Sequence, residues 1–344
     1  KKSRSPKHLR RMETALRSFR VLKGLTQQQV DNFMNSYIIY DLDWKDEKMM
    51  TEKLGPDYQN RVGECLRDYY SVLNHMCALG ELEKMYIPPV MDLNATIFMN
   101  QILYEESIAE ELQLPENAKV FDLGCGRGRV AAHMHMLTGA EVTGLNIDHD
   151  QVASAIAFTH EQKFPNNFVR RDMNDLPLPF ADEVFDGFYQ IQAMSLCKDI
   201  PKLCDELYRV LKPGARLSLL DWASLDAFNP EDTHHQDLMR KIKPLIGAVG
   251  TPTPKSLADA LESAGFTILK ANNASIDGLQ SPLIERAEFF FRTVRIGLRG
   301  AVKFGLLPAH FNTIFDRFAQ DGDAFIEADK ARLITTSYHW LAEK

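Results

Sequence analysis

Hydrophobic and polar positions follow one pattern before about residue 115 and a different one after it. From about residue 24 to 114, apolar residues recur mainly at helical spacing, and Thr26 stands where an N-cap would begin the first helix of this region. Gly80 and the pair Pro88-Pro89 interrupt the region, so we expect 81–87 to form a loop or a short turn. A later helix is indicated by four apolar positions: Ile97, Ile102, Ile108 and Leu112.

After residue 115, short apolar runs alternate with segments of helical periodicity. Strands are expected at 119–126, 140–147, 167–177, 184–194, 215–222, 266–273 and 333–344. Helices are expected at 128–139, 149–164, 200–214 and 253–265, and again within 275–330. The helix that begins at residue 200 is expected to end at the Lys-Pro-Gly stop at 212–214. Strands that alternate with helices predict βαβ units and a parallel sheet.

These elements predict an α/β fold with a Rossmann-like sheet and helices on both of its faces. The late helical region becomes an insertion before the last strand of the sheet. We therefore expect four parts: an N-terminal helical extension (1–68), a Rossmann-like core (69–274), a C-terminal helical cap (275–330) and a closing strand of the core sheet (331–344).

Composition narrows the class of protein. The 344 residues are 45% hydrophobic and 25% charged, which is ordinary for a globular enzyme with a real core. The formal net charge of -7 argues against a general nucleic-acid binder. The sequence holds no run of about 18 apolar residues, so it predicts no membrane span. His133 and His135 lie two apart in an expected helix and point in different directions, so we expect no metal site.

The first 24 residues are strongly basic, with Glu13 as their only acidic residue. Leu9, Met12, Leu16 and Phe19 fall at helical spacing, which leaves the basic residues largely on the other faces. Two interpretations stay open. The helix packs on the domain through this stripe, or it lies on an anionic membrane or derives from a targeting peptide.

The scattered cysteines bear on the compartment. There are five of them, with no CxxC pair and no regular spacing, which is typical of reduced thiols in a reducing environment. We expect the protein in the cytoplasm, or at the surface of an intracellular membrane. Import of a longer precursor into an organelle stays open.

The sequence Asp122-Leu-Gly124-Cys-Gly126-Arg-Gly128 falls at a turn from a strand to a helix. Glycine is needed where the backbone must approach a ligand closely, because a Cβ atom would collide with it. A dinucleotide site would show GxGxxG, which seats a pyrophosphate on the helix N-terminus. The GxGxG spacing with an acid just before it suits a ligand with an amino-acid end instead. Its carboxylate would meet backbone amides and its ammonium would face Asp122.

Further polar residues follow the next strands in an order that suits the rest of such a ligand. Asn146 ends the second strand and can bond ribose hydroxyls. Asp172 follows the third strand and can accept from an adenine amino group, with Met173 as an apolar neighbour. Phe185-Asp186 and the run 207–214 complete the order. Each has a structural alternative as a cap, a core residue or a helix stop.

The order FDLGCGRG, VTGLNID, VRRDMNDLPLPFADEVFDGFY and LYRVLKPGARLSLLDW resembles the class I S-adenosylmethionine-dependent methyltransferases. More narrowly, the chain is similar to the sterol C-methyltransferases over roughly residues 64–343. Asn146 stands where that family has Asn, and Asp221-Trp222 stand where it has an acidic residue before Trp. Tyr69-Tyr70 and the segments FFFRT and KFGLLP (289–293 and 303–308) also match.

Two departures fall in the motifs for the methyl acceptor. The family's Tyr-Glu-Tyr-Gly-Trp-Gly block is replaced by MCALGELEKMYIPP at 76–89. Its Ile-Glu-Ala-Thr-Cys-His stretch reads IQAMSL at 191–196, so the glutamate has become Gln192 and no His is present. Methylation of an alkene carbon creates a carbocation, which needs stabilisation and a base to take its proton. These departures put a reaction on a sterol side chain in doubt.

The resemblance implies S-adenosyl-L-methionine as the donor, S-adenosyl-L-homocysteine as the product and no metal. The implied donor-binding residues are Tyr69, Asp122, Gly124, Cys125, Gly126, Gly128, Asn146, Ile147, Asp172, Met173 and Gln190. The candidate catalytic residues are Asp221 as a base or cation stabiliser, with Gln192 and Tyr70. The candidate acceptor-binding residues are Tyr86, Met194, Trp222 and Phe290, with 275–330 forming a wall of the acceptor pocket.

Three functions stay open. The first is a C-methyltransferase for a sterol or isoprenoid lipid, and the second an N-, O- or S-methyltransferase for a more polar metabolite. A heteroatom acceptor brings its own lone pair and needs no carbocation management. The third is a non-catalytic protein that binds the donor. The expected partner is a small-molecule acceptor, not a nucleic acid. Peripheral membrane contact through the basic N-terminus and formation of a homo-oligomer stay open.

Overall fold

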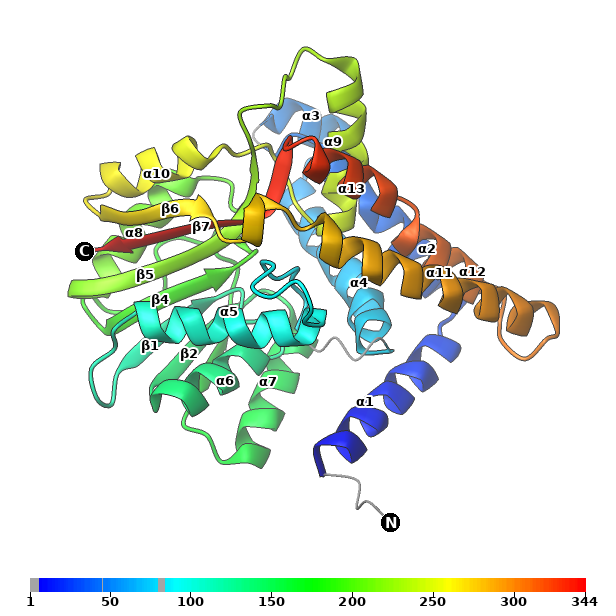
Figure 1. The fold of residues 1–344 in the computed structure, drawn as a ribbon, viewed down its shortest axis with the longest axis horizontal. Helices are drawn as coiled ribbons and strands as arrows, with labels where there is room; N and C mark the ends of the chain where they lie inside the picture. The colour runs from blue at the N-terminus through cyan, green and yellow to red at the C-terminus, as the bar shows by residue number, and fades with distance from the viewer. Residues whose placement is uncertain (1–5, 45, 80–83) are drawn as a thin grey trace.

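The computed structural model describes residues 6–44, 46–79 and 84–344. One sheet organises the fold, with the strand order β3-β2-β1-β4-β5-β7-β6 (Figure 1). The strands β3, β2, β1, β4 and β5 run parallel to one another, and β7 runs antiparallel to both β5 and β6. The strands are β1 Lys119–Leu123, β2 Glu141–Asn146, β3 Asn167–Arg170, β4 Phe185–Ile191, β5 Leu211–Ser224, β6 Thr267–Asn273 and β7 Ile334–Glu343.

Helices cover both faces of this sheet. One face is packed by α5 (Ile97–Glu111), α6 (Arg129–Thr138) and α7 (His149–Gln162), whose apolar residues meet those of β1, β2 and β4. The other face is packed by α8 (Ile200–Val210) and α10 (Pro254–Ser263). Because the central strands β1, β4 and β5 are largely buried on both sides, they are richer in apolar residues than the edge strand β3. The expected α/β class and its helical insertion before the last strand are confirmed.

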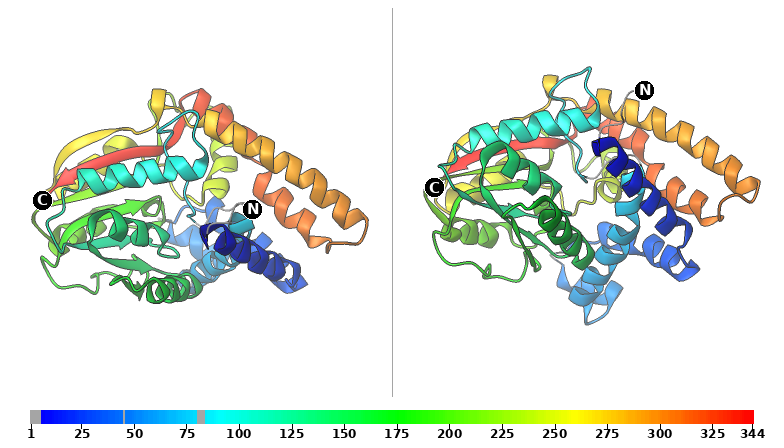
Figure 2. Two further views of the ribbon diagram at one scale, coloured as in Figure 1. Left: turned by 60° about the horizontal axis from the view of Figure 1, so that its bottom comes forward. Right: turned by 90° about the horizontal axis from the view of Figure 1, so that it is seen from below.

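A second helical body lies beside the sheet and combines the two ends of the sequence (Figures 1 and 2). Its N-terminal helices are α1 Pro6–Lys23, α2 Gln27–Ser36, α3 Glu47–Leu54 and α4 Tyr58–Leu79. Its C-terminal helices are α11 Ser281–Lys303 and α12 His310–Ala319. They share one core, in which Leu22 and Phe33 pack with Phe311 and Ile314. The predicted extension and cap are therefore joined in space.

Two more helices connect this body to the sheet. α9 (Thr233–Ile246) and α13 (Gly322–Lys330) pack against each other and against Trp222 and Ile334 at the ends of β5 and β7. The sequence patterns do not predict α9, because its polar residues and the internal Pro244 mask the buried stripe of Leu238, Met239 and Ile242. The predicted boundary after residue 68 falls inside α4, and the four-part division stays a prediction.

Several local expectations can be compared with the structure. Thr26 caps α2 in a capping box with Gln29, as its position predicts. The expectation for α8 is wrong at its end. The helix stops at Val210, and Leu211 is already extended and paired with Phe185, so the Lys-Pro-Gly segment belongs to the start of β5. The predicted loop at 81–87 lies partly outside the described residues.

The basic α1 packs through a face that differs from the predicted one. Leu16 is 50% exposed, whereas Ser18 and Leu22 are buried against α4 and α12. Phe19 does contact Phe311, with 5.9 Å between their ring centroids. The side chains of Leu9 and Met12 lie outside the described residues. Among the described helices, we find none with the length and hydrophobicity needed to cross a bilayer.

Candidate active site

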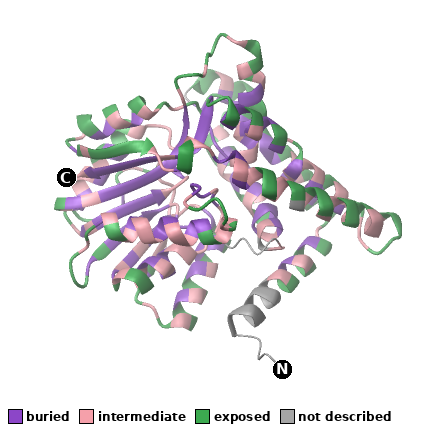
Figure 3. Ribbon diagram, in the orientation of Figure 1, coloured by how far each residue is buried: buried purple, intermediate pink, exposed green. Residues whose placement is uncertain are grey.

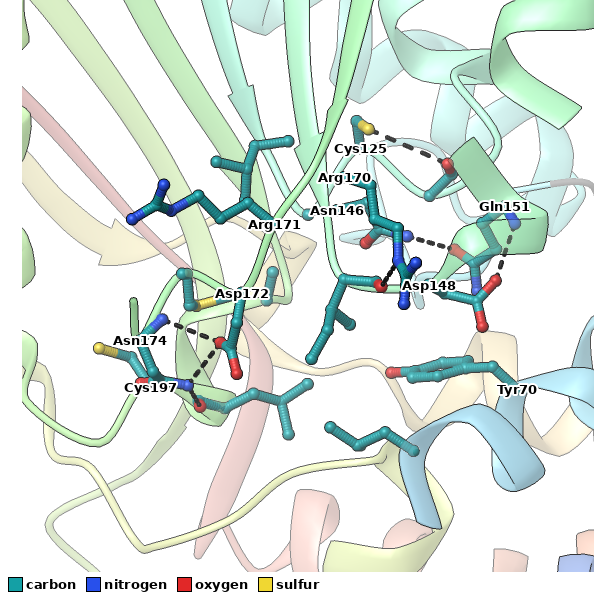
Figure 4. Close-up of a pocket in the computed structure, with 18 of the residues that line it drawn as sticks. Tyr70, Cys125, Asn146, Asp148, Gln151, Arg170, Arg171, Asp172, Asn174 and Cys197 are labelled. Carbon is teal, nitrogen blue, oxygen red and sulfur yellow. Dashed lines mark hydrogen bonds between the residues drawn. The ribbon is translucent and has the colours of Figure 1, made fainter. Parts of the chain in front are cut away.

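A cavity of about 820 Å³ opens at the carboxyl ends of β1 to β4 (Figure 4). This is the edge at which open α/β sheets bind their ligands, and the volume lies within the usual range for small-molecule sites. One wall consists of the turns that follow the strands. The opposite wall is formed by α4 and by the segment 84–86 that follows it. The sequence motif supplies the first wall, and the helical body supplies the second.

The glycine turn after β1 forms the floor of the cavity. Gly124 has φ 80°, and a Cβ atom there would lie 2.4 Å from the Cβ of Ala193 in the loop after β4. Gly126 has φ 51° and also lines the cavity, where only the Gln151 side chain would meet its Cβ. Any larger residue at Gly124 would therefore push apart the two loops on which a ligand rests.

Gly128 has a different role in the structure. A Cβ atom there would lie 2.7 Å from the ring of Phe168 and 2.9 Å from Ala155, and Gly128 is not among the described residues that line the cavity. It lets the start of α6 pack against α7 and β3. The third glycine of the motif is thus a packing residue in this structure, although the motif alone suggests ligand binding.

Asp122 ends β1 at the edge of the cavity and is almost completely buried. Its carboxylate accepts a hydrogen bond of 2.8 Å from the Tyr189 hydroxyl. Burial raises the pKa of Asp122 to about 7, and the nearby Glu105 carboxylate adds to this rise. A buried carboxyl with a raised pKa gains most from a cationic ligand, because the cation returns the stabilisation that water provides elsewhere.

Polar groups at the ends of β2 and β3 face the cavity from two sides (Figure 4). Asn146 donates to the Gln151 side chain at 3.1 Å, and the backbone N–H of Gln151 donates to the Asp148 carboxylate at 2.7 Å. Asp172 accepts two bonds of 2.9 Å from Asn174 through one carboxylate oxygen. These bonds fix the direction of each side chain. Cys125, Ile147 and Met173 line the cavity next to them.

The paired tyrosines of α4 separate in the structure. Tyr70 lines the cavity, whereas Tyr69 is buried between the rings of Phe33, Tyr37 and Tyr40 and donates to the Pro244 carbonyl at 3.3 Å. Neighbouring residues on a helix point about 100° apart, so both cannot face one ligand. Only Tyr70 is placed to cover a donor in this geometry.

Gln192 lines the cavity, but its amide is fully occupied by backbone groups. It accepts from the Ile87 N–H at 3.0 Å and donates to the carbonyls of Ile87 at 2.8 Å and Thr336 at 2.7 Å. Its φ of 54° is in the left-handed region. These contacts join the segment after α4 to the ends of β4 and β7. These bonds hold Tyr86 and its neighbours at the cavity, and both the oxygen and the nitrogen of the side-chain amide already have backbone partners.

Asp221 lies beneath the cavity and is not among its described lining residues. Its carboxylate accepts from Gln190 at 2.8 Å and from the backbone N–H groups of Met194 and Trp222 at 2.9 and 2.8 Å. Burial raises the pKa of Asp221 to about 6. The residue pins the loop after β4 that carries Ala193. This geometry favours a positioning role for Asp221 over direct contact with a ligand in the cavity.

The candidate acceptor residues are dispersed. Tyr86 lines the cavity and donates to the buried Glu105 at 2.7 Å. Met194 is buried in the core under α8, and Trp222 is buried against α9 and α13. The side chain of Phe290 lies outside the described residues. No described residue of 275–330 lines the cavity, because α11 and α12 pack on the far side of α4.

A buried charged cluster that the sequence patterns do not reveal lies beside the site. Glu105 of α5 is fully buried and pairs with Lys84, and it bonds His133 at 2.6 Å. Lys84 also lines the cavity. The side chain of His133 therefore bonds a carboxylate, whereas that of His135 bonds the Ala140 carbonyl at 2.8 Å. Nothing in the local sequence of these residues signals the cluster, since its members are about 20 to 30 positions apart.

Basic side chains outnumber acidic ones in the cavity lining. Of the described lining residues, five are aspartates, at 122, 148, 172, 175 and 199. The basic ones are Arg67, Lys84, Arg127, Arg129, Arg170, Arg171, Lys198 and Lys202. Within a chain of net charge -7, this excess favours ligands with acidic or electron-rich groups. No group of three potential metal ligands is found among the described residues.

Comparisons with known proteins agree with this geometry. Residues 121–219 match the family model described as "Methyltransferase domain". The chain is 28% identical to the methyltransferase phqN of Penicillium fellutanum, over 76% of this chain and 74% of that protein. It is 26% identical to the sterol 24-C-methyltransferase ERG6A of Gibberella zeae, over 70% and 68%. Among solved structures, the cyclopropane synthase MmaA2 of Mycobacterium tuberculosis superposes with a TM-score of 0.62 at 15% identity, covering 76% of this chain and 90% of that one.

The sheet order, the glycine turn and the matched domain define a class I S-adenosylmethionine-dependent methyltransferase. Within that class, the chain belongs near the sterol C-methyltransferases. It is thus an enzyme that methylates a small molecule. The roles given above to individual side chains stay predictions.

Proposed function

We propose that this enzyme transfers a methyl group to a nitrogen, oxygen or sulfur atom of a small amphipathic metabolite. One observation carries the proposal. Of the described residues that line the α4 side of the cavity, from Trp44 to Tyr86, none is an aspartate or glutamate. Gln192 and Asp221, which the family resemblance offers as acceptor-side groups, are both held by backbone and core contacts. A heteroatom acceptor does not require the missing carboxylate.

The residues present fit the donor that the family uses. The left-handed turn at Gly124 and Gly126 leaves room for an amino-acid end, and the buried Asp122 carboxyl would pair with its ammonium. Asn146 would meet ribose hydroxyls, and Asp172 would meet the adenine amino group. When bound, S-adenosylmethionine supplies an electrophilic methyl group on its sulfonium. The protein must then align the acceptor atom with that methyl and exclude water.

The α4 wall suits an acceptor that has both apolar and polar parts. Trp44, Val62, Leu66 and Met85 supply aromatic and aliphatic surface. Polar and basic groups lie among them: Gln59, Asn60 and Arg67. A small metabolite with an apolar ring system and one or two polar groups would satisfy both kinds of side chain, whereas a purely hydrocarbon acceptor would leave the polar ones unpaired.

A second candidate is methylation of a carbon atom of a sterol or isoprenoid lipid. The similarity to sterol 24-C-methyltransferases over about 70% of the chain favours it. The two candidates differ in chemistry, because methylation of an alkene carbon creates a carbocation that must be stabilised until a C–H proton is lost to a base, whereas a heteroatom acceptor reacts through its own lone pair. The assignment as a methyltransferase sets aside the third, non-catalytic alternative. Location in the cytoplasm or at a membrane surface, and self-association, stay predictions.

The test uses donor with a deuterated methyl group, incubated with the enzyme and a small-molecule extract of its source. Products that gain the label are partitioned between organic solvent and water at acidic and at alkaline pH. Mass-spectrometric fragmentation and the methyl chemical shift then identify the atom methylated. We expect a methyl group on a heteroatom; for an amine, the product would change phase with pH. A labelled neutral lipid that stays in the organic phase, with its methyl on carbon, would overturn the proposal and support the second candidate. Heat-inactivated enzyme is the control.

A further inference from the structure

The hairpin of α11 and α12 projects away from the rest of the molecule (Figures 1 and 2). One side of it packs on the N-terminal helices through residues such as Leu298, Val302 and Phe311. The opposite side of α11 and the turn beyond it are exposed (Figure 3). This outer face does not line the cavity, so the methyl-transfer site does not account for it.

Large apolar side chains are concentrated on this outer face. Phe289 is 76% exposed, Ile296 70%, Phe304 78% and Leu306 68%. They are the four most exposed large hydrophobic residues among those described. Phe289 and Ile296 are seven positions apart and therefore lie on one side of the helix. Phe304 and Leu306 follow in the turn directly after α11, which is exposed as well. Scattered apolar residues need no explanation, but an aligned set does.

The same face is basic. Arg292, Arg299 and Lys303 lie at positions that share the side of Phe289 and Ile296, and all three are exposed. From residue 289 to 315 the sequence contains no aspartate or glutamate. Asp316, just beyond, is shared by Arg295 at 2.8 Å and Arg299 at 3.0 Å. Arg292 lies 3.9 Å from Glu288 and 4.0 Å from Asp323, so the basic charge is least compensated at the turn end of the face. No described carboxylate pairs with Lys303.

We propose that this outer face of α11 and its turn docks on an anionic lipid bilayer, with the apolar side chains among the acyl chains and the basic ones at the headgroups. Exposed Phe and Leu beside Arg and Lys, with acidic residues only at the base of the hairpin and at Asp316, are what an interfacial helix needs. A symmetric contact with a second copy fits less well, because the turn end of the face, from Lys303 to Leu306, holds no carboxylate that could pair with the basic groups of the other copy. The surface differs from the basic α1, which the sequence alone suggests for membrane contact.

The proposal is independent of which atom the enzyme methylates. Docking would hold the enzyme at a surface where amphipathic small molecules collect. The test measures co-sedimentation of the full chain with phosphatidylcholine vesicles, with and without phosphatidylserine, at low and high salt. Binding is expected on the anionic vesicles, and it should weaken as salt screens the charges.

Two sets of variants separate the apolar and the charged contributions. Phe304→Ser combined with Leu306→Ser should lower vesicle binding about tenfold or more. Arg299→Gln combined with Lys303→Gln should lower binding to anionic vesicles and remove most of its salt dependence. The matched controls are Met136→Ser, at an apolar residue 62% exposed on α6, and Lys255→Gln, at an exposed lysine of α10. Both should bind vesicles like the wild type.

Thermal unfolding and S-adenosylhomocysteine binding should be unchanged in all these variants, since none of the positions contacts the cavity. Loss of vesicle binding could then not be attributed to misfolding. Wild-type protein that does not bind anionic vesicles would overturn the proposal. So would binding that survives the Phe304 and Leu306 changes. A wild-type dimer in analytical ultracentrifugation that these changes convert to monomer, without vesicle binding, would assign the face to a second copy instead.

Discussion

The two walls of the active-site cavity are built in different ways. The donor wall consists of short turns that directly follow β1, β2 and β3, so that residues close together in sequence are close together in space. The opposite wall comes from α4 and the segment after it, which are held against the sheet by a helical body made from both ends of the chain. The first wall keeps its family motif, and the second has lost it.

The difference shows how one fold can keep a donor and change its acceptor. On the donor wall, a substitution at Gly124 collides with backbone-anchored groups and is not easily absorbed. On the acceptor wall, side chains such as Gln59 and Arg67 face the cavity from one side of a helix whose other side carries the packing. The facing side can therefore change while the fold is kept, as long as the packing side is preserved.

The largest effect is expected from Gly124→Ala. The new Cβ would lie 2.4 Å from that of Ala193, at a φ of 80° that disfavours alanine. We expect about 3 kcal/mol of destabilisation and donor binding weakened by roughly 100-fold or more. Urea unfolding and calorimetric binding of S-adenosylhomocysteine measure both. Gly139→Ala is the matched control, since its φ of 73° is equally unfavourable but nothing lies within 4 Å of its Cβ. Equal losses in both variants would show that strain, not collision, limits Gly124.

Asp122→Asn should weaken donor binding by roughly 10- to 100-fold at alkaline pH, because an ammonium loses its carboxylate. In the wild type, S-adenosylhomocysteine binding should tighten as pH rises through about 7, where Asp122 ionises. The variant should show a flat profile over the same interval. Calorimetric titrations between about pH 6 and about pH 8 test this. A wild-type profile without a rise would remove Asp122 from donor recognition.

The same carboxyl affects the stability of the ligand-free protein. Its pKa rises from 3.8 to about 7 on folding, so the folded state binds the proton more tightly than the unfolded chain. This contribution is fully present below about pH 4 and is lost as pH rises through about 7, which amounts to about 4 kcal/mol. Asp122→Asn cannot ionise, so its unfolding free energy should fall less over this interval. Equal slopes for the two proteins would contradict the assignment.

Gln192→Glu restores the charge of the sterol family on the acceptor wall. A carboxylate cannot donate to the Ile87 and Thr336 carbonyls, which lie 2.8 and 2.7 Å from the present amide nitrogen. We expect about 2 to 3 kcal/mol of destabilisation from repulsion between these oxygens. Gln192→Met, which loses the same bonds without adding charge, serves as the control in chemical unfolding. A glutamate variant as stable as the wild type would mean that the side chain can turn into the cavity.

Asp221→Asn distinguishes a base from a positioning residue. The Met194 and Trp222 amides bond different carboxylate oxygens, so asparagine keeps an acceptor for only one of them. We therefore expect a moderate loss of stability but a kcat within roughly fivefold of the wild type. The pH dependence of kcat near 6, where Asp221 titrates, should be the same in both proteins. Asp221→Ala, which leaves those amides unpaired, should be clearly less stable. If Asp221 were a general base, Asp221→Asn would lower kcat by about 100-fold or more and remove the acidic limb.

The smallest effect is expected from Trp222→Phe. Trp222 is buried against α9 and α13, and its indole N–H has no partner among the described residues. The substitution should cost about 1 kcal/mol and leave the KM for the acceptor unchanged, because the residue does not reach the cavity. Trp340→Phe, which loses a 3.1 Å bond to the Pro254 carbonyl, should cost more. A rise in acceptor KM for Trp222→Phe would place it at the acceptor after all.

Much of the sheet and of the donor wall could be predicted from the sequence. Asp122, Asn146 and Asp172 end consecutive parallel strands, and such ends meet at one edge, so their presence at one cavity follows from chain order. Side-chain direction was less predictable. Tyr69 and Tyr70 look equivalent in sequence, yet only the helix rotation decides that Tyr70 faces the cavity. In the sequence, Gln192 and Asp221 suggest catalytic roles. In the structure, both side chains are held by hydrogen bonds to backbone groups of other segments, such as Thr336 and Met194.

The sequence by itself determined the α/β class and the glycine turn, because strand periodicity and turn chemistry act over a few neighbouring residues. The methyl donor came from the resemblance of its motifs to a known family. Only the tertiary structure decided the acceptor wall, the buried Glu105 cluster and the outer face of α11. Each depends on contacts between segments far apart in the chain, such as Lys84 with Glu105 or α12 with α2. Local sequence patterns do not indicate which distant segments will be in contact. Long-range packing chooses which residues are left facing a ligand or solvent.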